Sequence, residues 1–294
     1  MVTEAAPVHP AGIDDWEPWI RLGAFLGAFA AMAAWEVLSP RRERLHPRRV
    51  RWTANLGLVV LNSLAVRLAF PVAAAGFAAL AAERGWGALN AVELPPAVAF
   101  AVAVAALDLA IYFQHVMFHA VPLLWRLHRV HHADPDFDVT TGARFHPIEI
   151  LLSMAIKLAA IALIGAPAAA VLAFEVILNA CAMFNHGNVR LPEGLDRALR
   201  RVIVTPDMHR IHHSMEMAEA NSNYGFNLAW WDRLLGTYRA RAGLPQERMR
   251  IGVEGLTGSG PDVSLAGMLA MPLQGAAAHS RAPDPRLDGA GEPT

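Results

Sequence analysis

Four long apolar stretches restrict the fold of this chain more than any other feature, and they lie at residues 20–38, 54–82, 95–115 and 150–182. A helix needs about 20 mainly apolar residues to cross a bilayer. The composition agrees, since 54% of the 294 residues are hydrophobic and 17% are charged, whereas soluble domains carry nearer a quarter charged residues. The sequence therefore predicts an all-α integral membrane protein.

The fourth stretch is too long for one span and carries Gly165, Ala166 and Pro167 in its middle. Proline interrupts a helix because it lacks an N–H and its ring clashes with the preceding turn. We therefore expect about three full spans followed by a hairpin of two short helices that enter and leave on the same side. One long kinked helix is the alternative.

Arginines following the first stretch set the orientation. They are Arg41, Arg42, Arg44, Arg48, Arg49 and Arg51. The positive-inside rule places such a loop in the cytoplasm. The second span then leads out, the third leads back, and the hairpin returns the chain to the cytoplasmic face at His186. This topology predicts a multi-pass protein, of a bacterial inner membrane, whose histidines 115–213 converge on the cytoplasmic side.

Charge and cysteine counts exclude other classes. The 25 basic residues are balanced by 26 acidic ones, and there is one cysteine. A nucleic-acid partner needs a basic excess, and a disulfide scaffold needs paired cysteines. We expect neither.

Histidines are concentrated in the middle of the chain, where ten of the thirteen fall between His115 and His213. They form a pair at i and i+4 and two groups at i, i+3 and i+4, namely His115 and His119, then His128, His131 and His132, then His209, His212 and His213. His186 and His146 stand apart from these boxes. Since residues at these spacings share a helix face, and buried imidazoles each need a partner, the pattern predicts a metal cluster.

The number of histidines exceeds what one tetrahedral zinc binds and fits two metal ions. Imidazole suits iron, zinc, copper and nickel alike, so the ligand type alone leaves the metal open. The chain has no H-E-x-x-H sequence, which excludes the corresponding zinc proteases.

These boxes make the chain resemble the fatty acid hydroxylase / sterol desaturase superfamily of membrane di-iron oxygenases. The surrounding sequence is similar too: RFHPIE at 144–149, NHGN at 185–188, TPD at 205–207, NYG at 223–225 and WDRLLGTY at 231–238. The resemblance covers roughly residues 107–238. It implies a transmembrane helical base, a cytosolic cap that holds two iron ions, and O2-dependent attack on a lipid C–H bond.

Hydroxylation is the reaction we expect, with desaturation at the same site as the alternative. A non-enzymatic membrane metal protein or transporter is the alternative of another class. Some relatives carry a further histidine where this chain has Ala182, so His146, a water or Asn179 could complete the metal shell. We expect His186 among the ligands and His146 as a less certain addition.

Four carboxylates are candidates to orient the ligand histidines, because metal-bound imidazoles usually donate their other N–H to such groups. They are Asp108, Glu149, Asp207 and Asp232. The intramembrane Glu175, with Asn179 one turn on, is more simply a hydrogen-bonded contact between helices.

The partners expected are a membrane lipid and an external electron donor. The lipid would enter sideways from the bilayer, with Trp230 and Trp231 as interfacial anchors. The chain has no G-x-G-x-x-G fingerprint or ferredoxin-type cysteine run, so electrons would come from a ferredoxin or cytochrome with its reductase. Arginines such as Arg197, Arg200 and Arg201 could receive that donor, or simply form a solvated helix face.

The expected organisation has four parts: a polar segment at 1–19, transmembrane helices at 20–106, a fatty acid hydroxylase-like catalytic region at 107–240, and a tail at 241–294. The end of the tail, from His279, is rich in glycine, alanine and proline and is predicted to be disordered.

Overall fold

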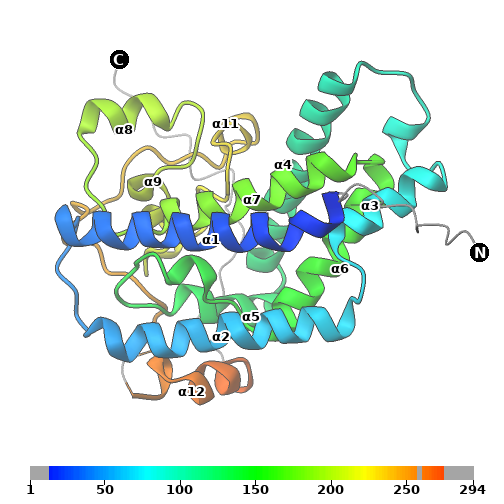
Figure 1. The fold of residues 1–294 in the computed structure, drawn as a ribbon. Coiled ribbons are helices and arrows are strands. Elements are labelled where there is room, and N and C mark those ends of the chain that lie inside the picture. The colour runs from blue at the N-terminus through cyan, green and yellow to red at the C-terminus, as the bar shows by residue number, and fades with distance from the viewer. Residues whose placement is uncertain (1–12, 257–259, 275–294) are drawn as a thin grey trace, which may run out of the picture.

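The computed structural model describes residues 13–256 and 260–274, which form helices and loops without a named strand (Figure 1). The α-helices are α1 (Ile13–Leu38), α2 (Arg48–Ala69), α3 (Ala74–Glu83), α4 (Pro96–Ala120), α5 (Pro122–His132), α6 (Pro147–Ile164), α7 (Ala168–Asn185), α8 (Glu193–Leu199), α9 (Pro206–His212), α10 (Met217–Ala220), α11 (Trp230–Leu234) and α12 (Leu265–Ala270). Short 3-10 helices are η1 (Ala88–Asn90), η2 (Thr141–Ala143), η3 (Gly260–Val263) and η4 (Met271–Leu273).

The predicted apolar stretches are helical, which confirms the all-α membrane class. Five segments in the described part of the chain are long and apolar enough to cross a membrane: α1, the α2–α3 pair, α4, α6 and α7. The second predicted stretch is divided, because α2 ends at Ala69 and α3 begins at Ala74, with Pro71 between them.

The predicted break between α6 and α7 is confirmed, and a single kinked helix is wrong. Gly165 ends α6 in the left-handed conformation with φ 72°, which glycine adopts without a side-chain clash. The turn packs against the loop between α3 and α4 so closely that a Cβ on Gly87 would lie 2.1 Å from the Gly165 nitrogen. The tip of this hairpin and that loop therefore lie at the same end of the bundle.

Helix α7 occupies the centre of the bundle and contacts α1, α3 and α4, while α6 packs on α2, α3 and α4. The largest core cluster combines small residues such as Ala78 and Ala103 with Leu107 and Phe174. Small side chains let apolar helices approach each other closely. The result is a slim helical base.

A cap of short helices covers the carboxyl ends of α4 and α7. It contains α5 and α8 to α11, and the segment from η3 to η4 packs against α2 and α5. The stretch from His279 that we predicted to be disordered lies outside the described residues.

A buried ion-pair network joins the cap to the base. Arg51 in α2 binds Asp134 and Asp138 in the loop after α5, with nitrogen–oxygen distances of 2.6 and 2.7 Å. Asn55, one turn further along α2, also donates to Asp134. The loop that carries these carboxylates is therefore fixed to a membrane helix.

A second set of charges connects three helices nearer the hairpin tip. Glu175 in α7 binds Lys157 in α6 and Arg21 in α1, at 2.6 and 2.5 Å. Each charge has an opposite partner, which is how ionisable groups are tolerated inside a membrane protein. Glu175 is thus a contact between helices, as expected.

Candidate metal centre

Nine buried histidines come together under the cap in two groups. The five-histidine group contains His115, His119, His128, His132 and His212, and the four-histidine group contains His131, His186, His209 and His213. Within each group, the potential ligand nitrogens all lie within 4.8 Å of one another. The two groups adjoin, since the rings of His132 and His213 stack with centroids 4.3 Å apart.

Helix geometry explains how one box serves both groups. In α5, His128 and His132 are one turn apart on the same face, whereas His131 points about 60° to one side. His128 and His132 accordingly belong to the five-histidine group and His131 to the other. The last box, in α9 and its C-cap, repeats this division with the groups exchanged: His209 and His213 belong to the four-histidine group and His212 to the other.

The hydrogen bonds of His115 and His212 leave two acceptor nitrogens facing each other. Their Nδ1 atoms lie 2.7 and 2.8 Å from the main-chain oxygens of Tyr224 and Ser222. A carbonyl only accepts, so each Nδ1 carries the proton and each Nε2 of a neutral ring keeps its lone pair. These two Nε2 atoms face each other at 3.0 Å.

Burial disfavours protonation as a way out of this conflict. Together with the neighbouring His115, it lowers the pKa of His212 well below its ordinary value. Two facing lone pairs repel unless a positive ion lies between them. The donor set therefore fits a bound metal ion.

In the four-histidine group, His186 shows the same conflict between acceptor nitrogens. Its Nδ1 donates to the main-chain oxygen of Ala182 at 2.7 Å. Its Nε2 is then an acceptor, yet it faces the Nε2 atoms of His131, His209 and His213 at 3.1, 3.1 and 3.2 Å. One lone pair cannot accept from three neighbours, so a shared cation is the partner that satisfies all four.

Glu149 is the one of the four predicted carboxylates that touches a ligand histidine. Its Oε1 lies 2.6 Å from Nδ1 of His128. His146 lies outside both groups: its Nδ1 accepts from the main-chain N–H of Ile148 and caps α6. The local sequence thus supplies a positioning carboxylate and a helix cap rather than a tenth neighbour in the cluster.

Asp232 contacts the main chain next to the histidine cluster rather than a histidine itself. It accepts hydrogen bonds from the main-chain N–H groups of Tyr224 and Gly225, at 2.7 and 2.9 Å. Burial raises the pKa of Asp232 to about 6, against the opposing hydrogen bond from Thr237. Because the oxygen of Tyr224 accepts from His115, Asp232 supports the loop that orients this ligand.

Asp108 and Asp207 contact other groups. Asp108 accepts from the indole N–H of Trp231 at 2.8 Å, and Asp207 binds Arg41 and Arg210. Both tie separate segments together rather than orienting an imidazole.

The main-chain oxygen of Ala182 accepts a hydrogen bond from Nδ1 of His186. The side-chain amide of Asn179 donates to the main-chain oxygen of Glu175 instead. Close approach is essential here, since a Cβ on Gly142 would lie 2.5 Å from the Ala182 oxygen and 3.3 Å from Nδ1 of His186. Gly142 therefore leaves room for the histidine that the four-histidine group shares.

Several supporting residues were not anticipated from the sequence. Phe145 stacks on His131 with centroids 4.3 Å apart. Arg144 donates to the main-chain oxygen of Val130 between two histidines of α5. Burial alone would raise the pKa of Asp134, but Arg51 and Arg144 hold it below its ordinary value. In the sequence, the ion-pair partners of Arg51 could have been recognised from the alternation Asp134, Asp136, Asp138 directly after the second box.

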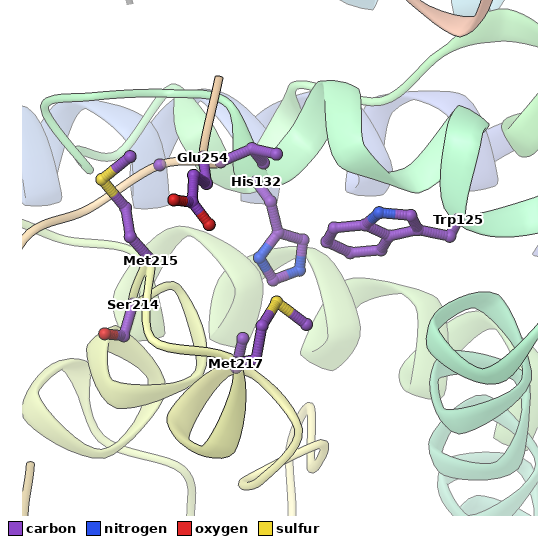
Figure 2. A pocket seen from close by; sticks show the side chains of 9 residues that line it. Trp125, His132, Ser214, Met215, Met217 and Glu254 are labelled. Carbon is purple, nitrogen blue, oxygen red and sulfur yellow. The ribbon is translucent and has the colours of Figure 1, made fainter. Parts of the chain in front are cut away.

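A narrow cleft reaches the five-histidine group from outside (Figure 2). Figure 2 shows the imidazole of His132 with the indole of Trp125 on one side and the carboxylate of Glu254 on the other. The remaining lining includes Met215 and Met217. Its enclosed space of about 10 Å³ is close to what one water requires, so the centre is nearly closed.

Comparison with known proteins agrees with this geometry. The sequence model of the family described as fatty acid hydroxylase matches residues 100–237. Ornithine lipid hydroxylase OlsE from Rhizobium tropici is 36% identical over 131 residues, which are 45% of this chain and 39% of that protein. Human alkylglycerol monooxygenase is 31% identical over 134 residues, covering 45% of this chain and 29% of that protein.

The Xenopus tropicalis alkylglycerol monooxygenase is 30% identical, with 28% of its length covered. The chain thus spans well under half the length of these curated relatives. No solved structure was found to match it. The matched region contains every histidine of both groups, so the part of the chain that holds them is similar to the fatty acid hydroxylase family.

Proposed function

We propose that this protein is a di-iron oxygenase that hydroxylates a C–H bond of a membrane lipid with O2. The observation that carries the proposal is the pair of facing Nε2 lone pairs on His115 and His212, which need a cation. Relatives named as a lipid hydroxylase and a monooxygenase support the reaction class.

The ligand geometry favours iron over a structural zinc. A five-nitrogen group exceeds the four ligands of tetrahedral zinc. Nε2 of His115 lies 3.1 and 3.0 Å from those of His128 and His212, so these three nitrogens could bind one ion together.

Iron bound at both groups would activate O2 for insertion of one oxygen atom into the lipid. The residues of the chain position and shield that chemistry. Glu149 and the Tyr224 carbonyl fix the protonated nitrogens of His128 and His115, which leaves the Nε2 atoms free to bind metal. Trp125 packs on His119 and His132, with centroids 4.9 and 5.2 Å away, and excludes bulk water from them.

The substrate and partners follow from the membrane setting. A lipid would approach from the bilayer, and a separate one-electron donor protein would supply reducing equivalents. The arginines after α1 place the histidine end of the bundle on the cytoplasmic side by the positive-inside rule, and we propose this orientation in a bacterial inner membrane.

The test is a metal and activity measurement on protein purified from iron-replete cells. We expect about two irons per chain, and O2 consumption that depends on added reductant and lipid. His131→Ala should abolish turnover. Stoichiometric zinc with no O2 consumption under any reductant would refute the proposal. Lipidomics of a deletion strain, searching for a species lighter by one oxygen, would identify the substrate.

A further inference from the structure

Part of the cap extends down beside a membrane helix. The main-chain N–H of Leu228 and the indole N–H of Trp231 donate to Oδ2 of Asp108, at 3.2 and 2.8 Å. One turn further along α4, the hydroxyl of Tyr112 lies 2.7 Å from that of Thr237. Asp108 is midway along α4, about 18 Å from either end at 1.5 Å per residue. Residues 228–237 therefore lie beside the middle of α4.

This segment turns large apolar side chains outward. Trp230, Leu234 and Leu235 are 45%, 73% and 47% exposed, and we call their surface the α11 face. On α4 itself, Phe113 follows Tyr112 and is 53% exposed. Helix α11 lies close to α4 in Figure 1, and its Trp231 donates to Asp108. Large exposed apolar side chains that gather in this way mark an interaction site.

Arginines border the α11 face. Arg233 projects from α11, stacks on Tyr238 at 3.7 Å and donates to the main-chain oxygen of Arg200. The indole N–H of Trp230 donates to the main-chain oxygen of Arg201, whose side chain is exposed. Tryptophan and arginine beside leucine are the composition of segments that lie in the headgroup region of a bilayer.

We propose that the α11 face is embedded in the membrane leaflet on the histidine side. The occupant of this surface is the bilayer itself, because Asp108 and Tyr112 hold this segment against a helix that is apolar and long enough to cross a membrane. Asp108 precedes His115 by seven residues, about 10 Å along the helix. The leaflet therefore reaches to within a few turns of the metal centre, and a lipid has only a short distance to travel.

The chain has a single cysteine, Cys181, so replacing it allows one label to be introduced at a chosen position. In a Cys181→Ala background, Leu234→Cys is given a nitroxide spin label and placed in nanodiscs of phosphatidylethanolamine and phosphatidylglycerol. Power saturation compares collisions with O2, which concentrates in lipid, and with a water-soluble nickel complex. Val98→Cys on the exposed surface of α4 is the lipid control, and Glu216→Cys on the exposed part of the cap is the water control.

We expect the Leu234 label to behave like the Val98 label, with nickel accessibility at least about fivefold below that at Glu216. Leu235→Cys gives a second measurement if the first variant does not fold. Nickel accessibility equal to that at Glu216 would overturn the proposal and leave the arginines to a soluble acidic partner. The readout does not depend on turnover or metal identity, so it separates this inference from the proposed reaction.

Discussion

Nδ1 of His128 and Oε1 of Glu149 lie 2.6 Å apart in a fully buried contact between α5 and α6. Glu149 lies in the first turn of a membrane helix, so this helix holds the orientation of a clustered histidine that the cap supplies. This relationship links the base of the molecule directly to the candidate metal centre.

Replacing Glu149 should weaken metal binding without unfolding the protein. Glu149→Gln keeps the shape and an acceptor but removes the carboxyl group that contacts His128. Loss of such an outer partner typically costs about 10–100-fold in metal affinity. Titration with a chelator, followed by metal analysis, measures this; unchanged affinity in the Gln variant and in Glu149→Ala would show that the contact does not position His128.

Alanine variants of His186 and His146 should differ sharply in metal content. His186→Ala removes the nitrogen shared by the whole four-histidine group and should lower the metal content by about one ion per chain. His146→Ala should retain the full content, because its ring caps α6 and lies outside both groups. Elemental analysis of both variants decides this, and metal loss from the His146 variant would show that we misplaced a ligand.

Gly142→Ala should disrupt the four-histidine group. The new methyl group would lie 2.5 Å from the main-chain oxygen of Ala182 and displace the acceptor of His186. The matched control is Gly194→Ala in α8, where nothing lies within 4 Å of the added Cβ. Metal content and thermal unfolding in detergent should fall for Gly142→Ala only; equal behaviour of the two variants would contradict the close packing described here.

Breaking the Arg51 network should destabilise the junction of cap and base. Arg51→Met leaves the buried carboxylates of Asp134 and Asp138 without their main cation, and removal of one partner from a buried ion pair costs about 3–5 kcal/mol. Arg49→Met, exposed on the same helix, should change stability by less than about 0.5 kcal/mol. Thermal unfolding of both variants measures the difference, and similar midpoints would mean that the network adds nothing.

The sequence predicted those features that depend on residues close together in the chain. Apolar length identified the spans, and Pro167 after Gly165 identified the turn. The histidine boxes were readable because their spacing follows the helix period, so neighbouring ligands share a face.

The groups that orient the ligands were harder to predict. His115 and His212 donate to main-chain oxygens of Tyr224 and Ser222, and a main-chain oxygen leaves no trace in a side-chain pattern. Asp207 stands beside the last box in the sequence but is drawn to Arg41, a residue 166 positions away. Proximity along the chain therefore identified the histidines that cluster and misassigned part of their surroundings.

The distribution of ligands along the chain also dictates an order of assembly during synthesis. A nascent polypeptide that has reached residue 200 holds four of the five donors of one group but only two of the four donors of the other. Helix α9, with seven residues, supplies missing donors to both. Metal bound at either group could therefore be fully ligated only once this late, short helix has docked, after all five apolar helices have been made.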